Sequence, residues 1–252
     1  MSSAIAFVAS FVSVLIGTAM GMILRRSLPA ELLEGGSREA IRLGAGFLAT
    51  IAALVIGLMI ASAKNSYDTQ NANIRQLGTN AVLVDQMLAK YGPDAKAARN
   101  LLRETIPSAT NRIWQENANG NGGGSTFYVT ETAERFYNAI EDLKPGNDEQ
   151  RSLKSRIVQI TTELGRTRLL VFTQSESAIP VPFFIVLAFW LVVIFASFSL
   201  FAEPSPIVFA SILVFALSVS SAMFLIVDLS HPFDGLMQIS NHHLRVVLPK
   251  IE

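Results

Sequence analysis

The chain has 252 residues, of which half are apolar, and its twenty basic and twenty acidic side chains cancel. That composition is too apolar for an ordinary soluble domain and too polar for a wholly embedded one. The absence of cysteine excludes disulfides and thiolate metal sites. All three histidines lie after residue 230, so we expect neither a metal site nor a cofactor.

Four apolar stretches are each long enough to span a bilayer, since about 20 residues at about 1.5 Å each cover the hydrocarbon core. They run over about 5–24, 43–63, 179–202 and 206–227, without a charged residue or histidine before their boundaries. RRSLPAELLEGG follows the first stretch without a small-residue cleavage site, and no positive region precedes it. We therefore interpret it as a retained helix rather than a signal peptide. The predicted fold is an all-α integral membrane protein with four transmembrane helices.

Small residues recur at helical spacing in the first two spans. Gly17 and Gly21 form GxxxG in the first, and Ala53, Gly57 and Ala61 form a similar row in the second. Helices in lipid associate through close backbone approach, which small side chains permit. These residues are therefore predicted to pack helix against helix, within one chain or between copies.

The second span also carries a second row, opposite or beside its small residues. The row is Phe47, Ile51, Leu54, Leu58 and Ser62. An uncharged apolar row can gate a pore by dewetting when several copies surround an axis, and it can equally face lipid. Spacing alone leaves both interpretations open.

Residues 64–178 have interspersed charges and are predicted to form a soluble helical bundle inserted between spans two and three. Two apolar seams recur at spacings of three and four residues: Ile74, Leu77, Ala81, Val84 and Leu88, then Leu153, Ile157, Ile160 and Leu164. Two further helices are expected, one starting near Pro93 and one over about 127–143. Breaks are expected at 91–93 and 144–146.

No pattern in the sequence supports an enzyme. The glycine run 120–124 lacks the following Gly-Lys-Ser/Thr of a phosphate-binding loop and is interpreted as a linker. His242 and His243 are adjacent, so on a helix they diverge by about 100° and suit one metal ion poorly. The predicted organisation is thus 1–63 with two spans, 64–178 soluble, 179–227 as a transmembrane hairpin, and 228–252 as a tail.

The tail opens with DLSHPFDG, a compact exit from the fourth span. Pro232 is expected to end the helix and Gly235 to permit a turn, with Asp228 placed where water or a donor reaches it. Residues 236–248 could form a short amphipathic helix. Two interpretations remain open: the tail folds back on the central domain, with Phe233 in the turn, or the chain simply ends at the interface.

Basic residues near the spans favour one orientation modestly. The loop between the first two spans carries Arg25, Arg26, Arg38 and Arg42. The other side carries Lys64, Arg75, Arg156, Arg166, Arg168, Arg245 and Lys250. The larger set favours termini and central domain in the cytoplasm.

Three segments carry a resemblance to a known family: NSYDTQNANIRQLGTNA at 65–81, IPVPFFIVLAFWLVVIFASFSLFAEPSP at 179–206, and FLIVDLSHPFDGLMQISNHHLRVVL at 224–248. With two spans, a helical domain, a tight hairpin and an Asp-x-x-x-Pro-Phe-x-Gly exit, the chain resembles the bestrophin-like four-span membrane proteins of bacteria. That domain family has no assigned function and distantly resembles the bestrophin anion channels.

The resemblance implies an oligomeric ion channel, a pentamer for anions, in the bacterial inner membrane. Its second helix would line the axis and place an apolar neck at Ile51, Leu54, Leu58 and Ser62. The implied partners are the lipid bilayer, further copies of the chain and inorganic ions, with no nucleic acid. The alternative is a non-conducting scaffold or sensor whose cytoplasmic domain binds a partner, which the heptad-like seams fit equally well.

Overall fold

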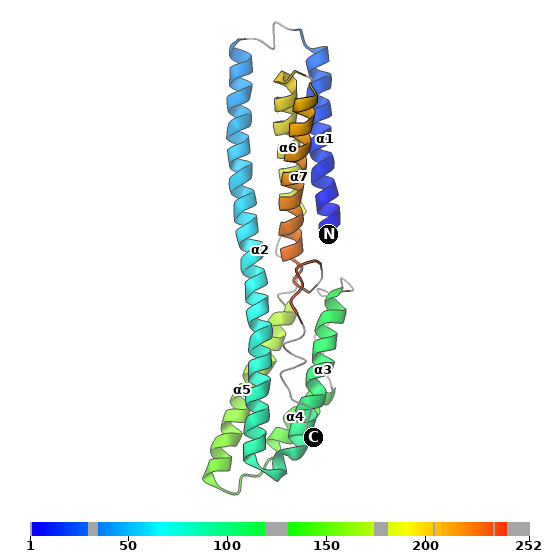
Figure 1. Cartoon of the computed structure of the whole chain (residues 1–252). Coiled ribbons are helices and arrows are strands. Elements are labelled where there is room, and N and C mark those ends of the chain that lie inside the picture. Colours follow the sequence, from blue (N-terminus) through cyan, green and yellow to red (C-terminus); the bar gives the residue numbers. More distant parts are fainter. Residues whose placement is uncertain are drawn as a thin grey trace. The chain divides into compact units, whose positions relative to one another are not determined.

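A computed structural model describes residues 2–29, 35–118, 131–173, 181–203, 205–233 and 235–240, which contain helices and turns but no strand. In chain order (Figure 1) the helices are α1 (Ser3–Ser27), α2 (Gly36–Tyr91), the 3-10 helix η2 (Pro93–Ala95), α3 (Lys96–Ala118), α4 (Glu131–Glu141), α5 (Asp148–Thr173), α6 (Val181–Phe201) and α7 (Pro206–Leu229).

Four of these helices are long and apolar enough to cross a membrane: α1, α2, α6 and α7. The prediction of an all-helical chain with four spans is therefore confirmed. The second span is the first part of a much longer helix, because no proline or glycine pair interrupts the chain between residue 63 and Tyr91.

The chain divides into two compact units. Unit 1 comprises Met1–Ser66 and Ser177–Ser230, and unit 2 comprises Tyr67–Glu176 and His231–Glu252. The division lies close to the boundaries expected after residues 63 and 178. The tail, however, belongs to unit 2 from His231 onward. That unit 2 is a soluble insertion stays a prediction.

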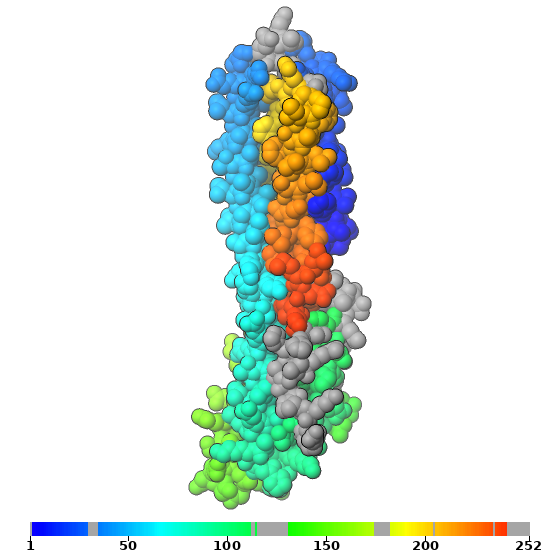
Figure 2. Space-filling view, in the orientation of Figure 1, coloured from blue at the N-terminus to red at the C-terminus, as the bar shows by residue number. Residues whose placement is uncertain are grey.

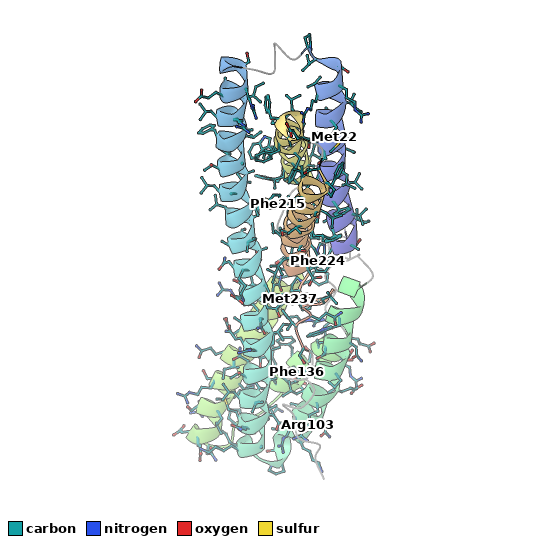
Figure 3. All side chains as sticks on the ribbon, turned by 45° about the horizontal axis from the view of Figure 1, so that its top comes forward. Met22, Arg103, Phe136, Phe215, Phe224 and Met237 are labelled. Carbon is teal, nitrogen blue, oxygen red and sulfur yellow. The ribbon has the colours of Figure 1, made fainter. Side chains whose placement is uncertain are left out.

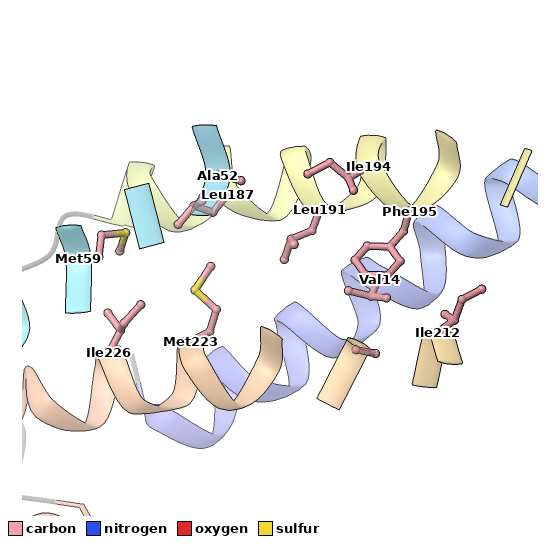
Figure 4. Close-up of a cluster of buried hydrophobic side chains, with 11 residues drawn as sticks. Val14, Ala52, Met59, Leu187, Leu191, Ile194, Phe195, Ile212, Met223 and Ile226 are labelled. Carbon is pink, nitrogen blue, oxygen red and sulfur yellow. The ribbon is translucent and has the colours of Figure 1, made fainter. Parts of the chain in front are cut away.

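Unit 1 packs α1, α6 and α7 closely, and the first part of α2 adds to their core. Figure 2 shows α7, in orange, beside α1, in dark blue. The core cluster joins Val14 of α1, Leu191 of α6 and Ile226 of α7 to Met59 of α2; Figure 4 shows Met59 and Ile226 on facing helices. The N-terminus of α7 is set by Ser205, whose Oγ accepts from the Val208 amide 3.3 Å away, and by Pro206 in the first turn.

Unit 2 is a helical bundle whose two predicted seams are confirmed. Every residue of the α2 seam is at most 7% exposed. In the α5 seam Ile157 is fully buried, and the other three seam residues, Leu153, Ile160 and Leu164, are half-buried. The main cluster of the bundle joins α2, α3, α4 and α5 through Leu88, Leu102, Phe136 and Ile157.

The breaks between these helices follow the sequence. Gly92 has φ +115°, which explains a glycine between α2 and Pro93. The helix expected over 127–143 is observed from Glu131 to Glu141. Residues 127–130 and the glycine run 120–124 lie outside the described residues, as do His242 and His243.

Candidate functional site: the open face of α2 and the C-terminal turn

The first part of α2 buries only a narrow stripe. Ala45, Ala52, Met59 and Ala63 are at most 7% exposed, and at about 100° per residue they lie on one side of the helix. Three of these four side chains are alanines. Of the four candidate spans, α2 is the least buried within the chain.

The opposite side of the same segment is open and apolar. Phe47 is 70%, Leu54 65% and Leu58 71% exposed. Ala53, Gly57 and Ala61 are exposed too, and a Cβ added at Gly57 would meet nothing within 4 Å. The small residues of this row therefore have no helix packed against them within the described chain. We call this surface, centred on Leu54, the open face of α2.

The residues predicted for the neck do not all lie in the open face of α2. Leu54 and Leu58 lie in the open face, and Ser62 is exposed at its flank. Ile51 is half-buried, about 60° from Leu54 around the helix, so it borders the face rather than occupying it. Phe47, which lies within about 20° of Leu54, belongs to the face but was not placed in the predicted neck. Spacing alone could not separate these residues, because it does not say which side α6 and α7 cover.

The GxxxG row of α1 has a different environment. A Cβ added at Gly17 would lie 2.5 Å from the carbonyl oxygen of Val192, and one at Gly21 would overlap that of Ala196. Both glycines are thus pressed against the backbone of α6. Close approach of α1 to α6 depends on these two residues lacking a side chain.

The C-terminal turn packs within unit 2. Gly235 has φ +102°, and the Ile239 amide donates to the carbonyl of Pro232 at 2.8 Å, which closes the turn. Phe233 and Ile239 are each 4% exposed and pack with Ile74 of α2. This is the fold-back onto the central domain that the sequence allowed, but residues 236–240 are not helical. The expected amphipathic helix is wrong over that stretch, because the Ile239 amide bonds the carbonyl of Pro232, seven residues back, instead of a carbonyl four residues back as in an α-helix.

Trp114 of α3 is the partner that sequence reasoning missed. Its ring meets Phe233 edge to face at 5.4 Å, and its Nε1 donates to the carbonyl of Ile239 at 3.3 Å. The signal in the sequence was a tryptophan in an otherwise polar stretch, since a buried indole needs both apolar contact and a hydrogen-bond acceptor.

Asp228, the first residue of the predicted exit, is 2% exposed at the end of α7 and belongs to unit 1.

A family model for the bestrophin-like domain matches residues 11–244, which is nearly the whole chain. The chain belongs to the bestrophin-like family. No curated protein and no solved structure matches it significantly. With four helices fit to cross a bilayer, this bestrophin-like protein is a multi-pass membrane protein in contact with lipid.

Unit 2 of the bestrophin-like chain holds one buried ionic cluster that the sequence analysis did not single out. Asp85, 5% exposed, accepts from Arg99 at 2.9 and 3.0 Å and from Arg103 at 3.0 and 3.1 Å. Both arginines bind the carboxylate in a bidentate manner, as their spacing of four on α3 allows. The sequence held a signal for this cluster. Asp85 adjoins the predicted seam residue Val84, and a carboxylate beside a buried seam needs positively charged partners.

The electrostatics of the cluster favour the charged form of Asp85. Burial raises the pKa of its carboxyl, but the hydrogen bonds and positive charges of Arg99 and Arg103 outweigh burial and hold that pKa below its ordinary value. The same contacts raise the pKa of Arg99. The cluster therefore fixes α3 against α2. Among the described residues, no three His, Asp or Glu side chains gather as for a metal ion.

Proposed function

We propose that this bestrophin-like chain assembles into an oligomeric ion channel, conducting anions, with the open face of α2 lining the pore. The observation that carries the proposal is the open face itself. Large apolar side chains and a row of small residues share one side of a membrane-crossing helix that its own chain leaves uncovered. Small residues let copies of a helix approach, and an uncharged apolar ring can close a pore by dewetting.

The neck is proposed at Phe47, Leu54 and Leu58, with Ile51 and Ser62 at its edges. None of the four spans carries a charge within its apolar stretch, which fits a passive apolar constriction better than a proton-coupled transporter. No step of this function needs a catalytic group or a cofactor, and we propose none.

The count of basic residues supports placing the termini and unit 2 on the cytoplasmic side of the bacterial inner membrane. Family membership supports both the ion-conducting function and assembly of several copies, with five suggested by the bestrophins. The rival function, a non-conducting scaffold, would make the open face a lipid surface.

The test is flux of chloride against potassium from liposomes holding the purified protein, with empty liposomes as control. Selective chloride flux is expected. In that assay the double variant Leu54→Ala, Leu58→Ala should raise the flux, because removing the apolar bulk lowers the dewetting barrier. Ile51→Ala should change it less.

The matched control is Phe189→Ala on α6, which truncates a side chain that is 62% exposed outside the open face. It should leave flux at the wild-type level. Absence of flux from wild-type protein over a range of pH and calcium would instead favour the scaffold. Equal effects of the α2 and α6 variants would remove the neck from α2.

A further inference from the structure

Unit 1 contains a pocket on the side of α2 away from the open face. It lies between α2, α6 and α7, has a volume of about 280 Å³, and is lined by Arg42, Ala45, Phe195, Phe198, Ile212 and Phe215. Figure 3 labels Phe215 of α7 in this part of the molecule. The volume suits part of one small amphiphile and is below that of most drug-sized ligand sites.

The pocket has a buried apolar floor and exposed apolar walls. Phe195 and Ile212 are 6% and 8% exposed, whereas Phe198 and Phe215 are 55% and 57% exposed. Phe198 and Phe215 lie on α6 and α7, outside the open face of α2, and we assign their exposed side to lipid. The pocket therefore opens toward the region that acyl chains occupy.

One end of the pocket is positively charged. Arg42 lines it, the guanidinium of Arg38 lies 5.8 Å from the ring centroid of Phe201, and an Nη of Arg25 donates to the carbonyl of Ala202. The described carboxylates near this end are Glu39 and Glu203, fewer than these three arginines.

We propose that this pocket binds an anionic phospholipid, with its phosphate at Arg42 and Arg38 and the upper part of one acyl chain over Phe195 and Ile212. The two halves of the site match the two halves of such a molecule. The arginines lie where spanning helices end and headgroups begin, and the apolar floor lies below them. A free anion would leave the apolar floor without a role.

The experiment measures lipid binding to the delipidated full chain in detergent, by native mass spectrometry and by thermal unfolding. Phosphatidylglycerol should be retained about fivefold more strongly than phosphatidylcholine and should raise Tm, since its headgroup carries a net negative charge and that of phosphatidylcholine does not. Arg42→Gln should reduce that preference, and Arg38→Gln gives a second, independent variant. Ala45→Phe, which fills the pocket, should weaken retention of both lipids.

The control is Arg26→Gln, which removes the same charge from an exposed position outside the pocket lining. It should retain phosphatidylglycerol as the wild type does. The proposal is overturned if the two lipids bind equally, or if Arg26→Gln loses as much as Arg42→Gln. It is also overturned if glycerol phosphate stabilises the chain as well as the lipid does, which would indicate a free-anion site. A change of oligomeric mass in Ala45→Phe with unchanged lipid retention would indicate a second copy as the occupant.

Discussion

The two halves of α2 bury opposite kinds of residue. Over 43–63 the buried positions are mostly alanine, while Phe47, Leu54 and Leu58 are exposed. Over 67–91 the buried positions include Ile74, Leu77, Val84, Leu88 and Tyr91, and the exposed ones are mostly polar. One uninterrupted helix thus changes its pattern at about residue 64.

The difference indicates what surrounds each half. In water, large apolar side chains gain by turning inward, which is the pattern of the second half. In lipid there is no such gain, and small residues at helix contacts allow close approach. The first half of α2 therefore has the pattern of a helix in lipid: its buried alanines pack within the chain, and its large apolar residues are left to contact lipid or another copy of the chain.

The largest expected effect concerns the second half. Asp85→Ala leaves two partly buried arginines without their carboxylate and should destabilise the protein by about 3–5 kcal/mol. The measurement is thermal unfolding of the full chain in detergent. Lys90→Ala, which breaks an ion pair with Glu149 whose side chains are 66% and 64% exposed, should change stability by less than about 1 kcal/mol. Equal losses would contradict a packed ionic cluster.

A second prediction compares a glycine in the open face of α2 with a glycine of α1 that is packed against α6. Gly21→Leu forces a side chain into the α6 backbone and should cost about 1–3 kcal/mol. Gly57→Leu meets nothing in its own chain, so the Tm of the monomer should hardly change. Its effect should be on assembly, measured as oligomer mass in detergent. If Gly57→Leu lowered monomer stability as Gly21→Leu does, the open face would be closed within the chain.

The smallest effect is the pH dependence of the second half. The pKa of Asp85 is depressed in the folded protein, so its contribution to stability is present above the ordinary carboxyl pKa and is lost as pH falls through the lower folded value. Between about pH 5 and 8 the cluster should leave Tm unchanged. Below about pH 4 the wild type should lose Tm faster than Asp85→Asn. Parallel acid curves would contradict the assigned role of Asp85.

The sequence was sufficient for the parts of the fold set by local patterns. Four uncharged stretches predicted four spans, and spacings of three and four predicted the buried seam from Ile74 to Leu88. It could not show which of two similar small-residue rows is packed within the chain, because the spacing around Gly17 resembles that around Gly57. Only the structure shows that α6 packs against Gly17. The contacts of Asp85 with α3 and of Phe233 with Trp114 join distant segments, which periodicity does not reveal.

The most direct test of the channel proposal uses the absence of cysteine from the chain. Leu54→Cys introduces a single thiol in the open face of α2, and Phe189→Cys introduces one at an exposed position on α6. Chloride flux from liposomes would be recorded before and after a charged, membrane-impermeant thiol reagent. The proposal predicts that flux through Leu54→Cys is blocked while flux through Phe189→Cys is unchanged. Unaltered flux through a Leu54→Cys protein shown to be modified would contradict a pore lined by α2.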